Sequence, residues 1–211
     1  MFKIKIVFGL IFMCMSCINT SFSNENNEFE LYLSKFKDIE IPHSITNKSM
    51  QKLLKNYSFD NTEFYNDCID SNFIRRITAD VLKINPDKLE VVPIYYPYGK
   101  YKINNLIFTI IFYIGNEDWD DDYDPNIKSY VVEIWTFDTS GKFTDYTQIG
   151  KCFGSYDFFI ECNILEQGDL EVTSTNKSTD KKTGKQIVKK DTDKYKLDMD
   201  LMEFKWIKPI K

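Results

Sequence analysis

Apolar residues change their spacing near Leu89, and this change determines the class of fold. Before Leu89 they recur every three or four residues, as on a helix face, and after it they follow the two-residue period of strands. Short turns such as residues 138–141 (DTSG) separate the later strands, and no helix-length segment lies between them. Strands joined in this way are antiparallel neighbours, so the sequence predicts an α+β fold. A helical part at residues 28–86 packs on an antiparallel β-meander of about seven or eight strands at residues 87–211.

Two of the expected strands are apolar at almost every position. Residues 106–114 read LIFTIIFYI, and residues 129–137 are also rich in large apolar side chains. This composition is typical of central strands that are covered on both faces. The other strands are expected at residues 89–96, 142–151, 157–165, 170–175, 185–190 and within 195–207.

The helical part is expected to contain three helices. Thr46 is placed to cap the second, Asp70 or Ser71 to cap the third, and Pro86 ends the third. The apolar faces comprise Phe29, Leu31, Tyr32 and Phe36, then Met50, Leu53, Leu54 and Tyr57, then Phe73, Ile77, Val81 and Ile84. Such a stripe can form a partner groove, but packing on a sheet is the much commoner use.

The first residues have the layout of an export signal. Lys3 and Lys5 precede an apolar run at residues 6–13, which is too short for a transmembrane helix of about 20 residues. A polar stretch rich in asparagine follows. The sequence therefore predicts export and a signal peptide at residues 1–17.

Two cleavage sites fit this leader. At Met15-Ser16-Cys17 the cysteine would become the lipidated N-terminus, although Cys14 stands where an aliphatic residue is usual. At Ser21-Phe22-Ser23 ordinary cleavage would release a soluble periplasmic or secreted protein. We favour lipid attachment at Cys17, with residues 18–27 as a flexible linker to a single domain at 28–211.

Charge and motifs exclude several function classes. The net charge of −5 and the absence of a basic stripe argue against nucleic-acid binding. The chain has a single histidine, His43, and lacks glycine-rich phosphate loops and nucleophile signatures. No catalytic residue, metal site or cofactor is predicted.

Three cysteines follow the leader, too few for a disulfide framework. Cys152 and Cys162 flank a predicted turn, so that a disulfide between them and two buried thiols are both compatible with the sequence.

The densest charge cluster is residues 117–124 (EDWDDDYD), which lie between two strong strands. Its carboxylates could chelate calcium, but the glycine and distal glutamate of an EF-hand loop are missing. A solvated loop that protects strand edges is the commoner reading. As a ligand or partner loop it would use Trp119, Asp120, Asp122, Tyr123 and Asp124.

The chain resembles small lipoproteins of Bacteroidota-type bacteria. The resemblance rests on Met15-Ser16-Cys17, on the Asn-, Lys- and Ile-rich composition, and on the hairpin at residues 130–142. It implies a cell-envelope location and a sheet-rich domain, and it supplies no catalytic residues.

We therefore expect a membrane-anchored cell-envelope protein that is a non-enzymatic binding module with a protein partner. An immunity-type protein is one form of this. The alternative is a hydrolase of envelope or extracellular polymers that uses strand carboxylates such as Glu133, Asp138 and Asp145.

Overall fold

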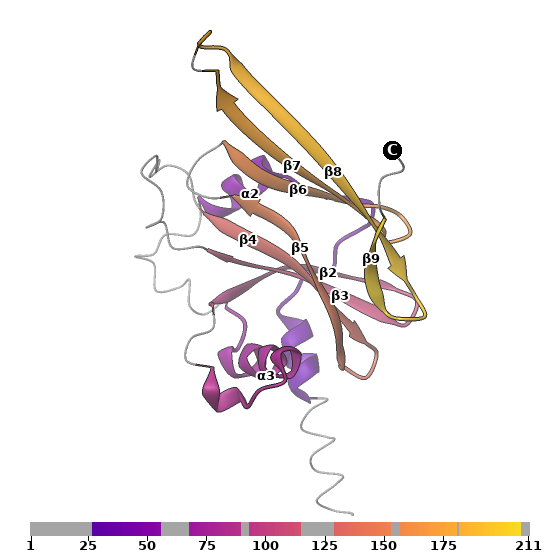
Figure 1. Cartoon of the computed structure of the whole chain (residues 1–211). Helices are drawn as coiled ribbons and strands as arrows, with labels where there is room; N and C mark the ends of the chain where they lie inside the picture. Colours follow the sequence, from indigo (N-terminus) through magenta and orange to yellow (C-terminus); the bar gives the residue numbers. More distant parts are fainter. Residues whose placement is uncertain are drawn as a thin grey trace, which may run out of the picture.

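One antiparallel sheet of nine strands makes up most of the computed structural model, which describes residues 27–55, 68–89, 93–114, 129–152, 157–180 and 182–207. Eight strands follow chain order across the sheet, as Figure 1 shows. They are β2 (Tyr95–Ile103), β3 (Leu106–Ile114), β4 (Tyr130–Asp138), β5 (Phe143–Cys152), β6 (Phe158–Ile164), β7 (Leu170–Thr179), β8 (Gln186–Asp198) and β9 (Glu203–Ile207). The antiparallel meander expected from the sequence is confirmed.

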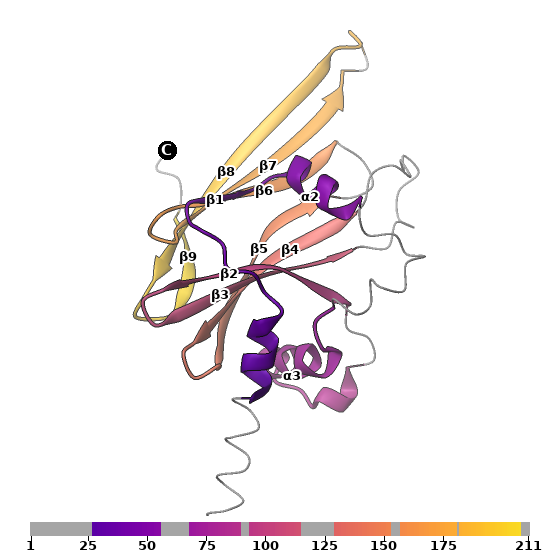
Figure 2. The same ribbon diagram turned by 180° about the vertical axis from the view of Figure 1, so that it is seen from behind.

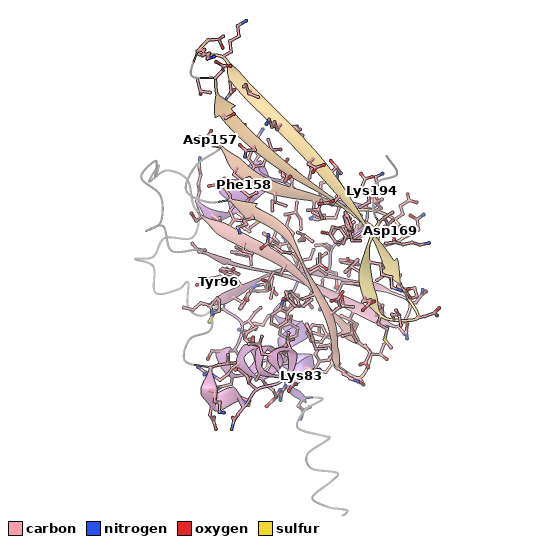
Figure 3. The ribbon with its side chains drawn as sticks, in the orientation of Figure 1. Lys83, Tyr96, Asp157, Phe158, Asp169 and Lys194 are labelled. Atoms are coloured by element: carbon pink, nitrogen blue, oxygen red, sulfur yellow. The ribbon has the colours of Figure 1, made fainter. Side chains whose placement is uncertain are left out.

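The helices begin where the capping residues predict. A helical segment covers residues 27–34, α2 covers Asn47–Leu54 and α3 covers Ser71–Leu82. Thr46 and Ser49 form a capping box at α2, and Asp70 accepts hydrogen bonds from backbone N–H groups in the first turn of α3. Lys83 ends α3 in the left-handed conformation, φ 53°, and is labelled in Figure 3. A short 3-10 helix, η2, follows at Pro86–Lys88.

Both faces of β3 and β4 are covered, as their composition predicts. Alternate side chains point into an inner core, which includes Leu106, Phe108, Ile110, Phe112, Val132 and Ile134, all 0% exposed. The intervening side chains point into an outer core beneath the helices, which includes Phe29, Tyr32, Phe73, Ile77, Ile111, Trp135 and Phe137. Large side chains on both faces are therefore explained by two separate cores.

The inner core is closed by the chain segment 37–45. The Ile39 N–H donates to the Lys100 carbonyl at 2.9 Å, and the Lys100 N–H donates to the Lys37 carbonyl at 2.9 Å, at the outer edge of β2. The segment continues as β1 (His43–Ile45), which pairs with β6 (Figure 2). A Cβ atom at Gly99 would lie 2.6 Å from Ile39, so this close approach requires glycine.

The second half of the sheet bends back over the same core. β5 and β6 pair only at Lys151–Ile160 and Cys152–Phe159, so the two strands are separate over the rest of their length. β9 returns towards β5, where the Phe204 N–H donates to Asp145 Oδ2 at 2.8 Å. The Phe204 ring lies 5.9 Å from that of Phe108.

The far ends of β7 and β8 extend past the last pair of β6 with β7, Phe158–Asn176, as an arm, which we define as residues 177–179 and 186–188 (Figures 1 and 3). β9 pairs with β8 only from Lys194 to Asp198, and residues 186–192 are all exposed. The arm and α3 lie at opposite ends of the molecule.

Three local expectations are corrected. The strand expected at residues 89–96 begins at Tyr95 instead, because a register shift at Pro97/Gly99 hides the two-residue period of β2. Leu31 is 65% exposed, and Leu33 takes its place in the apolar face of the first helix. The helical part also contains β1, whose three residues are too few to show a period.

Candidate functional site

A groove runs between α3 and the hairpin of β4 and β5, and we call it the α3 groove. Its larger section, about 910 Å³, extends from Gly141 and Lys142 to Tyr146. Its smaller section is a pocket of about 180 Å³ over Glu133, which we call the Glu133 pocket. The two sections are adjacent because both are lined by Ile77 and Tyr146.

Aromatic rings surround the carboxylate in the Glu133 pocket. Tyr95, Trp135, Phe143 and Tyr146 come from three different strands. The ring centroid of Trp135 lies 5.6 Å from that of Tyr95 and 5.5 Å from that of Phe143. Apolar side chains of α3 complete the lining, namely Ile77, Val81 and Leu82 with the methyl-bearing Thr78.

Glu133 is the one acidic residue that lines this pocket. The indole Nε1–H of Trp135, two residues further along β4, donates to Glu133 Oε2 at 2.8 Å. Burial raises the pKa of Glu133, and the bond from Trp135 only partly offsets this effect. Burial, together with the Glu133 charge, also raises the pKa values of Tyr95 and Tyr113. Among the described residues, no lysine or arginine forms an ion pair with Glu133.

The rim of the groove exposes apolar side chains. Phe73 and Ile77 pack on the sheet as expected, but Val81 is 38% exposed and Leu82 is 54% exposed. Tyr146 on β5 is 50% exposed and lines the same groove. The apolar stripe of α3 therefore serves two purposes, since its first half packs in the core and its second half forms a wall of the groove.

The other strand carboxylates have structural partners. Asp138 Oδ1 accepts from the backbone N–H groups of Ser140 and Lys142 and so holds the β4–β5 turn. Asp145 lies opposite Thr136 in the sheet, on the inner face, and its Oδ2 fixes β9 by accepting a hydrogen bond from the Phe204 N–H. Glu133 shares the outer face with Trp135, so the structure does not bring Glu133 and Asp145 together on one face.

His43 lies in β1, away from the α3 groove. Its Nε2 is 3.1 Å from the Tyr98 hydroxyl, with which it shares a hydrogen bond. Burial, and the nearby charge of Lys37, lower the pKa of His43. Its contacts are those of a structural side chain.

The bridge considered between Cys152 and Cys162 is not formed, and both residues are thiols. Cys152 is opposite Phe159 in the sheet, so Cys162 lies three residues further along β6. This offset is about 10 Å, beyond the roughly 7 Å between Cα atoms that a disulfide allows. Burial raises the pKa of Cys152 to about 11 and that of Cys162 to about 12, so neither is a reactive thiolate at neutral pH.

Several predicted site residues lie outside the described residues. They are Cys17 and the proposed ligand or partner loop of Trp119, Asp120, Asp122, Tyr123 and Asp124. Within the described ranges, no three His, Cys, Asp or Glu side chains gather in a way that could hold a metal ion. No helix in these ranges has the length and apolar character to cross a membrane.

Comparison with known proteins adds no relative. No family model, no curated protein and no solved structure matches this chain.

Sequence reasoning singled out Glu133 but missed the aromatic residues around it. A signal was present, because Glu133 is the one charged residue in residues 130–137, a segment that is apolar apart from Glu133 and Thr136. Trp135 has the same parity in the strand and is therefore on the same face. Tyr95 and Tyr146 come from other strands, and only the fold brings them to Glu133.

Proposed function

We propose that this chain is an exported binding protein of the bacterial cell envelope that captures a partner protein in the α3 groove and performs no catalysis. The observation that carries the proposal is the groove itself. Exposed Val81, Leu82 and Tyr146 surround a pocket in which aromatic rings enclose one carboxylate. Aromatic side chains beside apolar contacts are the usual energetic centre of a protein interface.

The N-terminal sequence supports a location at a membrane. Lipidation at Cys17 would leave residues 18–26 as a tether, and nine residues reach at most roughly 30 Å. The first described residues lie at the same end of the molecule as α3 (Figure 1). A tether at this end would hold the α3 groove near the membrane and point the arm away from it.

The geometry favours binding over hydrolysis. Hydrolysis of a glycoside uses two carboxylates that flank one bond. Of the three strand carboxylates considered, only Glu133 lines the Glu133 pocket, and although Asp145 borders the larger section of the groove, Asp138 holds a turn and Asp145 accepts from the Phe204 N–H of β9.

Two measurements test the proposal. Mass analysis of the protein from its native host should find an acyl group on Cys17, and an N-terminus at Asn24 would contradict the anchor. Pull-downs from envelope extracts should recover a protein that the Val81→Ser/Leu82→Ser variant binds at least about tenfold less, a loss of about 1.4 kcal/mol. The matched control is Ile187→Ser/Val188→Ser in the arm, which also removes two exposed aliphatic side chains and should bind normally. Equal recovery by all three proteins would contradict a role for the groove.

A further inference from the structure

The Glu133 pocket has the chemistry of a cation site. Its lining combines one carboxylate with four aromatic rings, and no lysine or arginine belongs to it. The negative faces of aromatic rings attract cations, and a nearby carboxylate adds a full opposite charge. Aromatic pockets of this kind bind ammonium groups.

Glu133 lacks the counter-charge that its burial calls for. The carboxylate has one described hydrogen bond, from Trp135 Nε1, and no described ion pair. A partly buried carboxylate loses hydration, and pairing with a cation recovers part of that loss. Its cross-strand neighbours, Ile111 and Gln148, carry no charge.

The pocket also limits the size and type of ligand. Its volume of about 180 Å³ is below the roughly 300 Å³ at which pockets for drug-sized ligands begin. An anion would be repelled by Glu133, and a metal ion would find one carboxylate where hard cations require several oxygen ligands. A neutral apolar group would fill the space but leave the carboxylate without a counter-charge. A group the size of an alkylammonium head satisfies both the size and the charge.

We propose that the Glu133 pocket binds an alkylammonium group, with the nitrogen at the Glu133 carboxylate and the carbon chain against Tyr95, Trp135 and Tyr146. This inference rests on the proposed function, because it names the chemistry that the groove recognises in its partner. A lysine side chain of a partner protein carries this group, and so does a small free amine.

The test follows the Trp135 indole Nε1–H resonance of the full chain by NMR, at constant ionic strength. The probes are n-butylammonium and 1-butanol, which share a carbon chain and differ in charge. We expect n-butylammonium to bind at least about tenfold more tightly, in the range of one charge-assisted hydrogen bond. Nα-acetyl-lysine-N-methylamide and choline identify the source of the ammonium group. The compound that binds with the lower Kd shows whether a polypeptide lysine or a small quaternary ammonium ion fits the pocket better.

Three variants assign the effect to named groups. Glu133→Gln keeps an acceptor for Trp135 and removes the charge, so the preference for n-butylammonium should fall to within about twofold. Glu171→Gln on β7 is the matched control, because Glu171 is also partly buried but pairs with Lys194 at 2.8 Å, away from the groove. It should keep the full preference. Tyr146→Leu should weaken n-butylammonium binding about threefold, the contribution of one exposed cation–π contact.

Equal binding of n-butylammonium and 1-butanol, no binding of either, or an unchanged preference in Glu133→Gln would overturn the inference. The proposed function is measured separately by the Val81/Leu82 pull-down. If the cation test fails but the Val81→Ser/Leu82→Ser variant still loses the partner in the pull-down, the cation site is rejected and the proposed binding role stands.

Discussion

The two faces of β3 and β4 are covered in different ways. The inner face is enclosed by the bent sheet, by segment 37–45 and by α2, and its apolar side chains are fully buried. The outer face is covered by two helices. α3 has 12 residues and is about 18 Å long, whereas a strand of 9 residues extends about 30 Å. α3 is therefore shorter than these strands, and the Glu133 pocket lies beside its last two turns, from which Ile77 and Val81 line it.

Complete and partial coverage of a sheet face have different consequences. A sheet face enclosed by its own strands needs only apolar side chains of the right volume. A face covered by short helices is covered incompletely, and beside the last turns of α3 the chain carries a partly buried carboxylate and the half-exposed Tyr146. We infer that the inner face provides stability and that the incompletely covered part of the outer face provides recognition.

The largest expected effect is on the inner face. Phe112→Ala removes a ring that is 0% exposed and should lower the free energy of unfolding by about 3–5 kcal/mol. Urea denaturation measures this change. A loss below about 1 kcal/mol would show that the inner core can collapse around the cavity, and would remove the distinction between the faces.

A smaller effect is expected at the helix-covered part of the outer face. Phe73 is buried and stacks on Tyr32, with ring centroids 4.3 Å apart. Phe73→Ala should cost about 2–3 kcal/mol, since α3 can shift partly into the space. The same variant should also weaken partner capture, because α3 forms one wall of the groove. Full partner binding together with a loss of stability would show that the position of α3 is not required.

At the incompletely covered part of the outer face, loss of the Glu133 charge should stabilise the protein. Burial raises the pKa of Glu133 above 4.5, so the native state binds the proton more tightly than the unfolded state. The wild-type protein therefore loses stability as the pH rises from the unfolded-state pKa of Glu133 through its raised native-state pKa. The Glu133→Gln variant has no titrating carboxylate at this position and does not show this loss. At pH 7.5 the variant should melt roughly 2–4 °C higher, and the gain should vanish below pH 4.

Thermal melts of both proteins between pH 4 and pH 8 measure this difference. Tyr95 and Tyr113 stay neutral over the range, because burial raises their pKa values. Glu171→Gln serves as the control and should show no such gain, because it removes an ion pair. A lower melting temperature for Glu133→Gln at pH 7.5 would mean that the carboxylate already has a cationic partner.

The smallest effect is expected in the arm. Ile187 is 40% exposed on β8, and Ile187→Ser should change the free energy of unfolding by less than about 0.5 kcal/mol. A cost above about 1 kcal/mol in the same denaturation experiment would indicate that Ile187 is more buried in solution than its 40% exposure in this structure implies.

Much of the sheet could be predicted because its signals are local. The run at residues 106–114 shows burial on both faces, and Asp70 marks the start of α3 through its own side chain. β1 could not be predicted, because three residues have no measurable period and the strand exists only by pairing with β6. The site was half predicted, since Glu133 stands out in its strand while the tyrosines around it do not.

The amino-acid order alone determined the alternation of the strands and the caps of the helices, because each depends on neighbours within a few residues. Tertiary structure alone decided which face each carboxylate occupies and which aromatic rings meet. The sequence offers both Glu133 and Asp145 as strand carboxylates, but the register of β4 with β5 places Glu133 in the Glu133 pocket and Asp145 opposite Thr136, where it accepts from the Phe204 N–H of β9. Sheet register and the packing of α3 against β4 and β5 are properties of the folded molecule, and they create the pocket.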